Sequence, residues 1–283
     1  MEMQNKLAVS LLLFIGASDA LLSPTFRQFL RENYGPSLES ELTRADVGDG
    51  GSFGGGRHTA RTPTENRPVI LVHGITNQAG TFGPIRQYFL KHNYRDAEVY
   101  GTTYGDAGKT NVVFVTMNCH YVKMIRALIQ TVADFTSSKV NVIGYSMGSP
   151  IARKAIKGGV CVETGENLGP SLSHLVHVYI GVAGANFGSF LCVLPIGSCN
   201  LINGMACGSR YLNDINAQQR YEGQFIYTIA STGDEKVGYQ ACGREASAIV
   251  GQNGKFVKNG LNHDQLMFST VGMQYNLVTH NHE

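Results

Sequence analysis

The fold is decided by one stretch of the sequence, Val140-Asn141-Val142-Ile143-Gly144-Tyr145-Ser146-Met147-Gly148-Ser149-Pro150-Ile151-Ala152. Its first residues are mostly apolar and β-branched, which predicts a buried strand. Gly144 and Gly148 lack the side chains that would collide where a strand turns sharply into a helix. Apolar residues then recur at helical spacing up to position 156. This order predicts a nucleophile elbow with the Ser146 hydroxyl projecting from the sheet; an ordinary loop is the alternative.

A serine hydroxyl is a poor nucleophile at neutral pH, so such an elbow needs two partners. A neutral imidazole takes the proton, and a carboxylate holds that imidazole in the required tautomer. In folds with this elbow the chain order is serine, acid, histidine. Asp234 fits, because residues 227–230 form an apolar strand and residues 231–234 form the loop after it. Asp214 is the alternative acid, although no convincing strand leads into it.

His263 is the candidate base. It lies in the loop 259–264, which opens onto the last predicted helix. Elimination favours it among the nine histidines. The others fall at the C-terminal end, near a glycine-rich loop, on helices before the elbow or on strands: His58, His73, His92, His120, His174, His177, His280 and His282. A solvated surface histidine is the alternative interpretation.

Two backbone N–H groups are expected to stabilise the negative charge that develops on oxygen during acyl transfer. One belongs to the residue after the nucleophile, Met147. The other belongs to the loop after the first core strand, where Gly74 permits the turn and Ile75 is the expected donor. His73 then shapes this loop and does not act as a base.

Strands and helices alternate along the chain from about residue 67. A short helix is expected within 21–45, and the glycine-rich stretch 47–56 is expected to be a flexible loop. Near-continuous apolar strands with helical crossovers favour the α/β class, a mainly parallel sheet with helices on both faces. The predicted strands are 68–72, 97–103, 140–144, 175–182 and 224–230, and the predicted helices are 83–93, 112–135, the one after the elbow and 264–277.

The N-terminus has the pattern of a secretory signal peptide. Lys6 precedes an apolar run at 7–17, and small residues allow cleavage after Ala20. The run is too short to span a bilayer comfortably, which disfavours the alternative of a membrane anchor. A secreted, extracellular protein is therefore expected. The expected division is a signal peptide at 1–20, an N-terminal segment with the glycine-rich loop at 21–66 and a catalytic domain at 67–283.

Composition and spacing exclude several other functions. The formal net charge is only +2 and the basic residues are scattered, so no nucleic-acid partner is expected. Six cysteines in an exported chain predict up to three disulfides, and these are expected to constrain the stretch around 192–207. The cysteine spacings fit no zinc site. Residues 104–110 end like a phosphate-binding loop, but Thr103 stands where that loop needs its first glycine. Neither a metal nor a cofactor is expected.

Taken together, these segments resemble the secreted class 2 lipases of the α/β-hydrolase superfamily, and the nematode members closely. The resemblance runs from about residue 50 to the C-terminal end. It implies an α/β-hydrolase fold, a triad of Ser146, Asp234 and His263, and oxyanion donors at Ile75 and Met147. It also implies a cofactor-free carboxylic ester hydrolase that acts on acylglycerols or similar lipids. The matching segments are 68–74, 100–106, 140–155, 182–186, 234–237 and 263–264.

The expectation is a secreted serine esterase with a lipid ester and water as its two substrates. A lipid–water interface is a candidate surface for it, and no protein partner is expected. A catalytically inactive hydrolase fold that binds lipid is one alternative, and an acyltransferase is another. The irregular insertion at 186–210 is expected either to face the acyl chain or to pack as plain structure.

Overall fold

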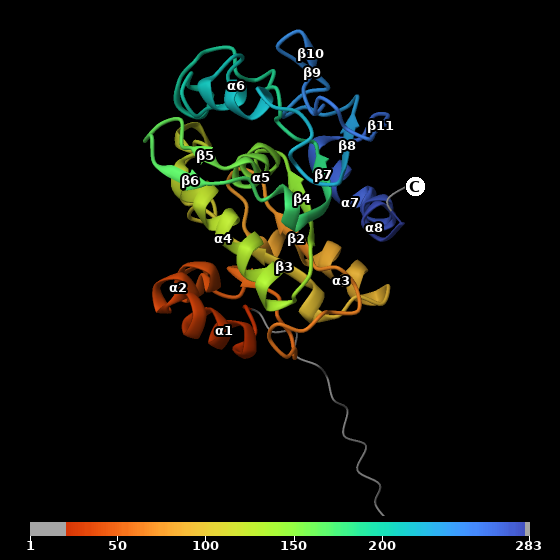
Figure 1. The fold of residues 1–283 in the computed structure, drawn as a ribbon. Coiled ribbons are helices and arrows are strands. Elements are labelled where there is room, and N and C mark those ends of the chain that lie inside the picture. The colour runs from red at the N-terminus through yellow and green to blue at the C-terminus, as the bar shows by residue number, and fades with distance from the viewer. Residues whose placement is uncertain (1–20, 281–283) are drawn as a thin grey trace, which may run out of the picture.

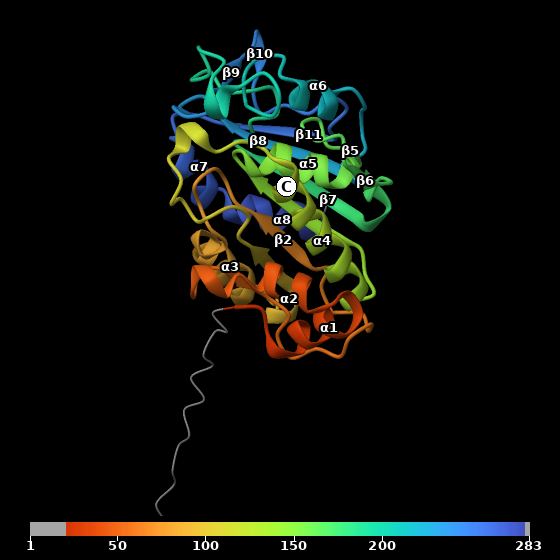
Figure 2. The ribbon, with the colours of Figure 1, turned by 90° about the vertical axis from the view of Figure 1, so that its left-hand side faces the viewer.

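A seven-stranded sheet with helices on both faces forms the centre of the molecule (Figures 1 and 2). The computed structural model describes residues 21–280, so the predicted signal peptide at 1–20 lies outside the described residues. The strand order is β1-β3-β2-β4-β7-β8-β11, and each neighbouring pair is parallel except β1 with β3. This confirms the predicted α/β-hydrolase architecture.

The inner strands are buried on both faces, as expected for nearly continuous runs of apolar residues. The strands of the large sheet are β1 (Ser52–Phe53), β2 (Val69–Val72), β3 (Val99–Thr102), β4 (Val140–Tyr145), β7 (Val176–Val182), β8 (Phe225–Ser231) and β11 (Gly254–Lys258). Two small sheets lie outside it, formed by β5 (Gly159–Val160) with β6 (Asn167–Gly169) and by β9 (Gln240–Ala241) with β10 (Arg244–Glu245).

Alternate strand side chains point to opposite faces, so the inner strands contribute to two cores. Ile70 and Val72 of β2 lie in the core beneath α1 (Pro24–Tyr34), α2 (Pro36–Thr43), α4 (Cys119–Phe135), α5 (Gly148–Lys157) and α6 (Arg210–Asn216). Val69 and Leu71 lie in the other core, beneath α3 (Gly83–Lys91), α7 (His263–Ser269) and α8 (Val271–His280). Short 3₁₀-helices in the connecting loops are η1 (Ala45–Val47), η2 (Ala79–Phe82), η3 (Asp96–Glu98), η4 (Val112–Phe114), η5 (Ser173–Leu175) and η6 (Gly197–Cys199).

Two helix predictions were wrong in their boundaries. The predicted helix 112–135 begins only at Cys119, because Asn118 caps α4 by accepting a 3.1 Å hydrogen bond from the N–H of Tyr121. The predicted helix 264–277 is divided at Thr270 into α7 and α8. Serine, β-branched residues and glycine follow one another there, and all of them favour the helix poorly.

The glycine-rich stretch 47–56 is not the flexible loop that was expected. Ser52 and Phe53 form β1, which pairs with β3 and is buried. Gly51 lies so close to the carbonyl oxygen of Arg44 that a side chain would not fit. The glycines therefore permit close packing of backbone on backbone, and they let this segment cover one edge of the sheet.

Three loops meet at the carboxyl ends of the parallel strands β4, β8 and β11. Ser146 directly follows β4, Asp234 follows β8, and His263 follows β11. Strand β11 was not predicted from the sequence, although it carries the chain to the candidate base. The topology alone therefore brings the three residues to the same end of the sheet.

Three disulfides join the cysteines of the described chain, as their number predicted. They are Cys119–Cys161, Cys192–Cys199 and Cys207–Cys242. The second closes a short loop between β7 and α6, within the stretch that was expected to be constrained. Among residues 21–280, no helix is both long enough and apolar enough to cross a membrane.

Candidate active site

Ser146 lies at the tip of a strained turn between β4 and α5. Its φ angle is 56°, in the left-handed region that side chains other than glycine rarely adopt. Gly144 makes this turn possible, because a Cβ there would come within 2.7 Å of the Cα of Ser149. Gly148 likewise packs directly on the backbone carbonyls of the β2 end. The elbow predicted from the sequence is therefore present, and it presents the serine hydroxyl beyond the end of the sheet.

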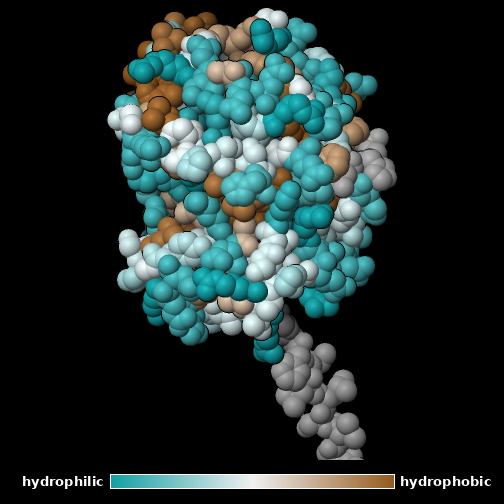
Figure 3. All heavy atoms as spheres, viewed as in Figure 1, coloured by the Kyte–Doolittle hydropathy of each residue, from teal (hydrophilic) through white to brown (hydrophobic). Residues whose placement is uncertain are grey.

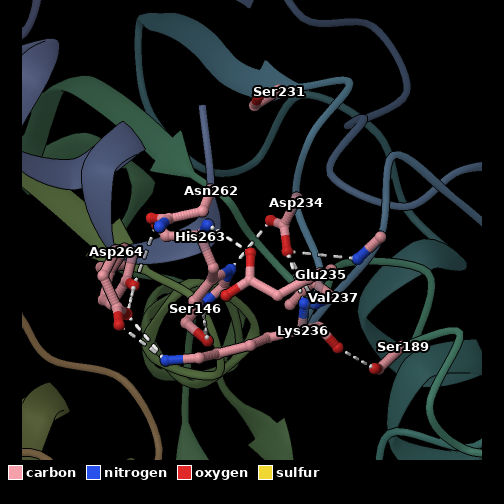
Figure 4. A network of polar contacts seen from close by, with 12 residues as sticks. Ser146, Ser189, Ser231, Asp234, Glu235, Lys236, Val237, Asn262, His263 and Asp264 are labelled. Carbon is pink, nitrogen blue, oxygen red and sulfur yellow. Dashed lines mark hydrogen bonds and ion pairs between the residues drawn. The ribbon is translucent and has the colours of Figure 1, made fainter. Parts of the chain in front are cut away.

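His263 is the first residue of α7, and its ring faces Ser146 (Figure 4). Its Nε2 lies 2.9 Å from the Oγ of Ser146. The backbone N–H of His263 donates to Glu235 at 2.8 Å. Its carbonyl oxygen lies 3.2 Å from the hydroxyl of Tyr145, whose single hydrogen also faces Asp264 at 2.9 Å. Asn262 caps the helix, which fixes where the ring projects.

Asp234 lies on the far side of the same imidazole. Its Oδ2 is 2.8 Å from Nδ1 of His263, so Nδ1 carries the hydrogen and Nε2 is left to accept one from Ser146. The other carboxylate oxygen, Oδ1, accepts backbone N–H groups of residues 236, 237 and 238 at 3.0, 2.9 and 3.3 Å. Burial raises the pKa of Asp234, but the hydrogen bond and charge of His263 and these N–H groups outweigh it and lower the pKa overall.

The alternative acid, Asp214, is engaged elsewhere. Its carboxylate forms ion pairs of 2.7 Å with Lys154 and with Lys157, both on α5. The structure therefore brings Ser146, His263 and Asp234 together and leaves Asp214 in an ion-pair network between α5 and α6.

The expected oxyanion donors flank the serine on two different loops. Within residues 21–280, the backbone N–H groups of Ile75 and Met147 form no hydrogen bond, which leaves them free to donate to a ligand. Ile75 lies in the lining of the same cavity as Ser146. A Cβ on Gly74 would lie 3.0 Å from the Cβ of Ser146, so this loop passes directly against the nucleophile.

His73 holds the loop that carries Ile75. Its Nδ1 donates to the carbonyl of Gly74 at 2.8 Å, its Nε2 accepts the N–H of Tyr104 at 3.1 Å, and the two rings stack with centroids 3.9 Å apart. Burial lowers the pKa of His73 to about 4, so the ring is neutral at neutral pH. This agrees with the prediction that His73 shapes the loop.

A cavity of about 870 Å³ opens onto Ser146 and His263. Its lining is mostly apolar and comes from η4, the Cys192–Cys199 loop and α7: Val112, Val113, Leu191, Val193, Leu194, Ile196, Met267 and Phe268. Among residues 21–280, no group of three or more His, Cys, Asp or Glu side chains is placed to hold a metal ion.

Sequence reasoning missed four polar residues beside the triad. Glu235 holds the backbone N–H of His263, Tyr145 contacts Asp264 with its hydroxyl, and Lys236 and Asp264 form an ion pair in the cavity lining. Each is one or two residues from a triad member along the chain. That proximity was the available signal, but adjacency in sequence does not say which side chains point into the cavity.

The lowered pKa of Asp234 predicts how stability depends on pH. The ordinary pKa of an aspartate, 3.8, applies in the unfolded chain, so the ionised carboxylate stabilises the fold above that value. This contribution is lost as the pH falls through the lower pKa of the folded state. We expect the destabilisation by Asp234→Asn to be largest near neutral pH and to shrink below about pH 4, measured by urea unfolding of both proteins. A difference that stays constant with pH would contradict this.

Comparisons with known proteins agree with this geometry. The sequence matches the family described as lipase (class 2) over residues 66–276. No curated protein matches the chain. The fold is similar to Aspergillus fumigatus lipase B, with a TM-score of 0.54 and 17% identity over 74% of this chain and 52% of that one. This chain thus spans about half the length of that lipase.

Two further solved structures are similar over nearly their whole length. Bacillus licheniformis lipase BlEst2 in its mature form has a TM-score of 0.54 and 15% identity, over 81% of this chain and 98% of that one. The Paleococcus ferrophilus monoacylglycerol lipase has a TM-score of 0.51 and 14% identity, over 81% of this chain and 97% of that one. At such identities the structures show a shared fold. The family match covers more than half of the sequence, and the chain belongs to the class 2 lipase family.

Proposed function

We propose that the chain is an extracellular serine hydrolase that cleaves acylglycerols or related lipid esters through an acyl-enzyme. The observation that carries this proposal is the chain of hydrogen bonds from Ser146 through His263 to Asp234 beside a largely apolar cavity. The predicted signal peptide and the three disulfides support an extracellular location. The closer likeness to nematode members stays a prediction.

In the first half of the reaction, Ser146 Oγ attacks the ester carbonyl carbon and its proton passes to Nε2 of His263. The carbonyl oxygen becomes negatively charged, and the free N–H groups of Ile75 and Met147 are the donors that stabilise it. When the intermediate collapses, the bond from carbon to the alcohol oxygen breaks. His263 gives its proton to that oxygen, the alcohol departs, and the acyl group stays on Ser146.

Water completes the cycle by the same route. His263 removes a proton from a water molecule, whose oxygen attacks the acyl carbon, and the proton then returns to Ser146 as the fatty acid leaves. Asp234 stays ionised throughout and stabilises the imidazolium that forms in each half. Its lowered pKa supports this role, because the carboxylate remains charged well into the acidic range.

A chain-length series of nitrophenyl esters, compared with an emulsified triacylglycerol, tests the proposal. Hydrolysis of both, together with labelling of Ser146 by a fluorophosphonate, is the expected result. If the folded protein binds lipid but is not labelled by the fluorophosphonate, it is instead a catalytically inactive lipid-binding protein. Preferential transfer of the acyl group to an added alcohol, measured from the products, identifies an acyltransferase.

An exposed apolar rim at the cavity supports action at a lipid–water interface. We define the rim as η4 and the loop 191–196, whose most exposed side chains are Val193 at 83% and Phe114 at 71%. Gly197, which directly follows this loop, packs on the carbonyl of Val113, so the end of the loop lies against η4 although the two are distant in sequence. Hydrophobic residues gather on the surface at the upper left of Figure 3, the region of the loop between β7 and α6. Apolar surface of this kind beside a lipid site favours contact with an aggregated substrate.

Replacing Phe114 by serine is expected to weaken binding to emulsified triacylglycerol about tenfold, since a large apolar side chain no longer enters the lipid. Hydrolysis of a short dissolved ester should be unchanged, because Phe114 lies outside the cavity lining. Sedimentation with the emulsion and a dissolved-ester assay measure the two effects. Val160→Ser is the matched control, since Val160 is 54% exposed and lies outside the rim. If Phe114→Ser lowered emulsion binding and hydrolysis of the dissolved ester equally, the role of the rim would be contradicted.

A further inference from the structure

The ion pair between Lys236 and Asp264 lies in the lining of the mostly apolar cavity. Among the described residues that line it, these two are the only ones with a Lys, Arg, Asp or Glu side chain. Lys236 Nζ lies 2.9 and 2.7 Å from the two carboxylate oxygens of Asp264. Figure 4 shows the Lys236 side chain extending past Ser146 to reach Asp264. The side chains are 51% and 60% exposed, so solvent or a ligand reaches both.

The pair lies in the same cavity lining as His263, on the side from which the alcohol part of an ester is expected to leave. The leaving oxygen takes its proton from Nε2 of His263, so it sits within hydrogen-bond distance of that ring. Asp264 directly follows His263, and Lys236 reaches over from the Asp234 loop. The charged surface beside His263 is therefore this ion pair, whereas the insertion and η4 supply apolar surface that could accept the acyl chain.

The pair has hydrogen-bonding capacity to spare. The ammonium of Lys236 has three hydrogens, of which its two contacts with Asp264 use at most two. The carboxylate has about four acceptor positions and receives Lys236 at both oxygens and the Tyr145 hydroxyl at 2.9 Å. One donor of the ammonium and one acceptor position of the carboxylate thus remain on the pair. A hydroxyl group matches them, because it accepts from the ammonium while it donates to the carboxylate.

We propose that the Lys236–Asp264 pair binds a free hydroxyl on the alcohol part of the ester, so that the enzyme prefers partial esters of polyols such as glycerol over esters of simple alkanols. This proposal rests on the proposed function and names the substrate class for the same site. Lys236 and Asp264 are specificity residues here, and the triad performs the reaction on either kind of ester.

The test compares kcat/KM for glycerol monobutyrate and for ethyl butyrate, two dissolved esters with the same acyl chain. The wild-type protein should prefer the glycerol ester. Lys236→Met and Asp264→Asn should each lower the ratio of the two values about fivefold to tenfold, because a half-exposed hydrogen bond to a charged group is lost. Lys236→Arg keeps a donor in place and should retain most of the ratio. Thermal unfolding of each variant establishes that it is folded.

Lys123→Met is the matched control, because Lys123 forms a comparably exposed ion pair with Glu166 outside the cavity. It should leave the ratio unchanged. If Lys236→Met and Asp264→Asn lower kcat/KM equally for both esters, the pair only holds the triad loops together and the proposal is wrong. A wild-type ratio of the two kcat/KM values near one also overturns the proposal about the pair, but it does not contradict the proposed ester hydrolysis. If the wild-type protein hydrolyses neither ester and resists fluorophosphonate labelling, the proposed function itself has failed.

Discussion

Ser146→Ala is expected to lower kcat for ester hydrolysis by roughly 10⁴- to 10⁶-fold while the protein stays folded. The Oγ of Ser146 is the atom that lies 2.9 Å from the imidazole of His263, and alanine leaves nothing there to form the acyl-enzyme. Residual activity would come only from the oxyanion donors and substrate binding. Nitrophenyl butyrate hydrolysis and fluorophosphonate labelling measure the loss, and labelling should disappear.

Ser138→Ala is the control for this variant. Ser138 precedes β4 and so lies at the opposite end of the strand from Ser146, where its hydroxyl donates to the neighbouring Lys139 carbonyl. The same chemical change there should leave the rate and the labelling at wild-type levels. Labelling that persists in Ser146→Ala would instead show that another nucleophile is responsible.

Asp234→Asn is expected to lower kcat about 10⁴-fold through the tautomer of His263. Three backbone N–H groups hold Oδ1 of Asp234, and they should hold the amide oxygen of asparagine in the same place. The amide nitrogen is then forced toward Nδ1 of His263, which must become the acceptor. Nε2 carries the hydrogen in that tautomer and does not accept the proton of Ser146.

Asp214→Asn tests whether this loss is specific. Asp214 was the alternative acid in the sequence, and its carboxylate pairs with Lys154 and Lys157 instead of the imidazole. We expect a modest loss of stability and nearly wild-type kcat. A rate for Asp234→Asn within tenfold of the wild type would mean that another group orients His263.

The candidate triad could be predicted because its evidence lies in short segments and in their order along the chain. The turn at Ser146 needs glycines at fixed positions, and these stand in the sequence on either side of it. Asp234 and His263 were found by the chain order that a parallel sheet with this elbow imposes. The core strands could be predicted for a similar reason, since strands buried on both faces are continuous apolar runs.

The rest depended on contacts between distant segments. Strand β11 has lysines at positions 255 and 258 and only two large apolar residues, so nothing but its pairing with β8 identifies it. The glycine-rich segment was expected to be flexible because close packing against Arg44 does not show in composition. Likewise, the crossing of Lys236 to Asp264 joins two loops that sequence analysis treats separately.

Strand β11 has one neighbour in the sheet, and its residues are half-buried or exposed. Local opening is easiest at such margins, where few contacts must break. The candidate base His263 thus follows a strand at the margin of the sheet, whereas Ser146 follows a strand in its middle. We therefore expect mild heating to separate the His263 imidazole from the Ser146 hydroxyl before the core unfolds, so that activity is lost at a lower temperature than the fold.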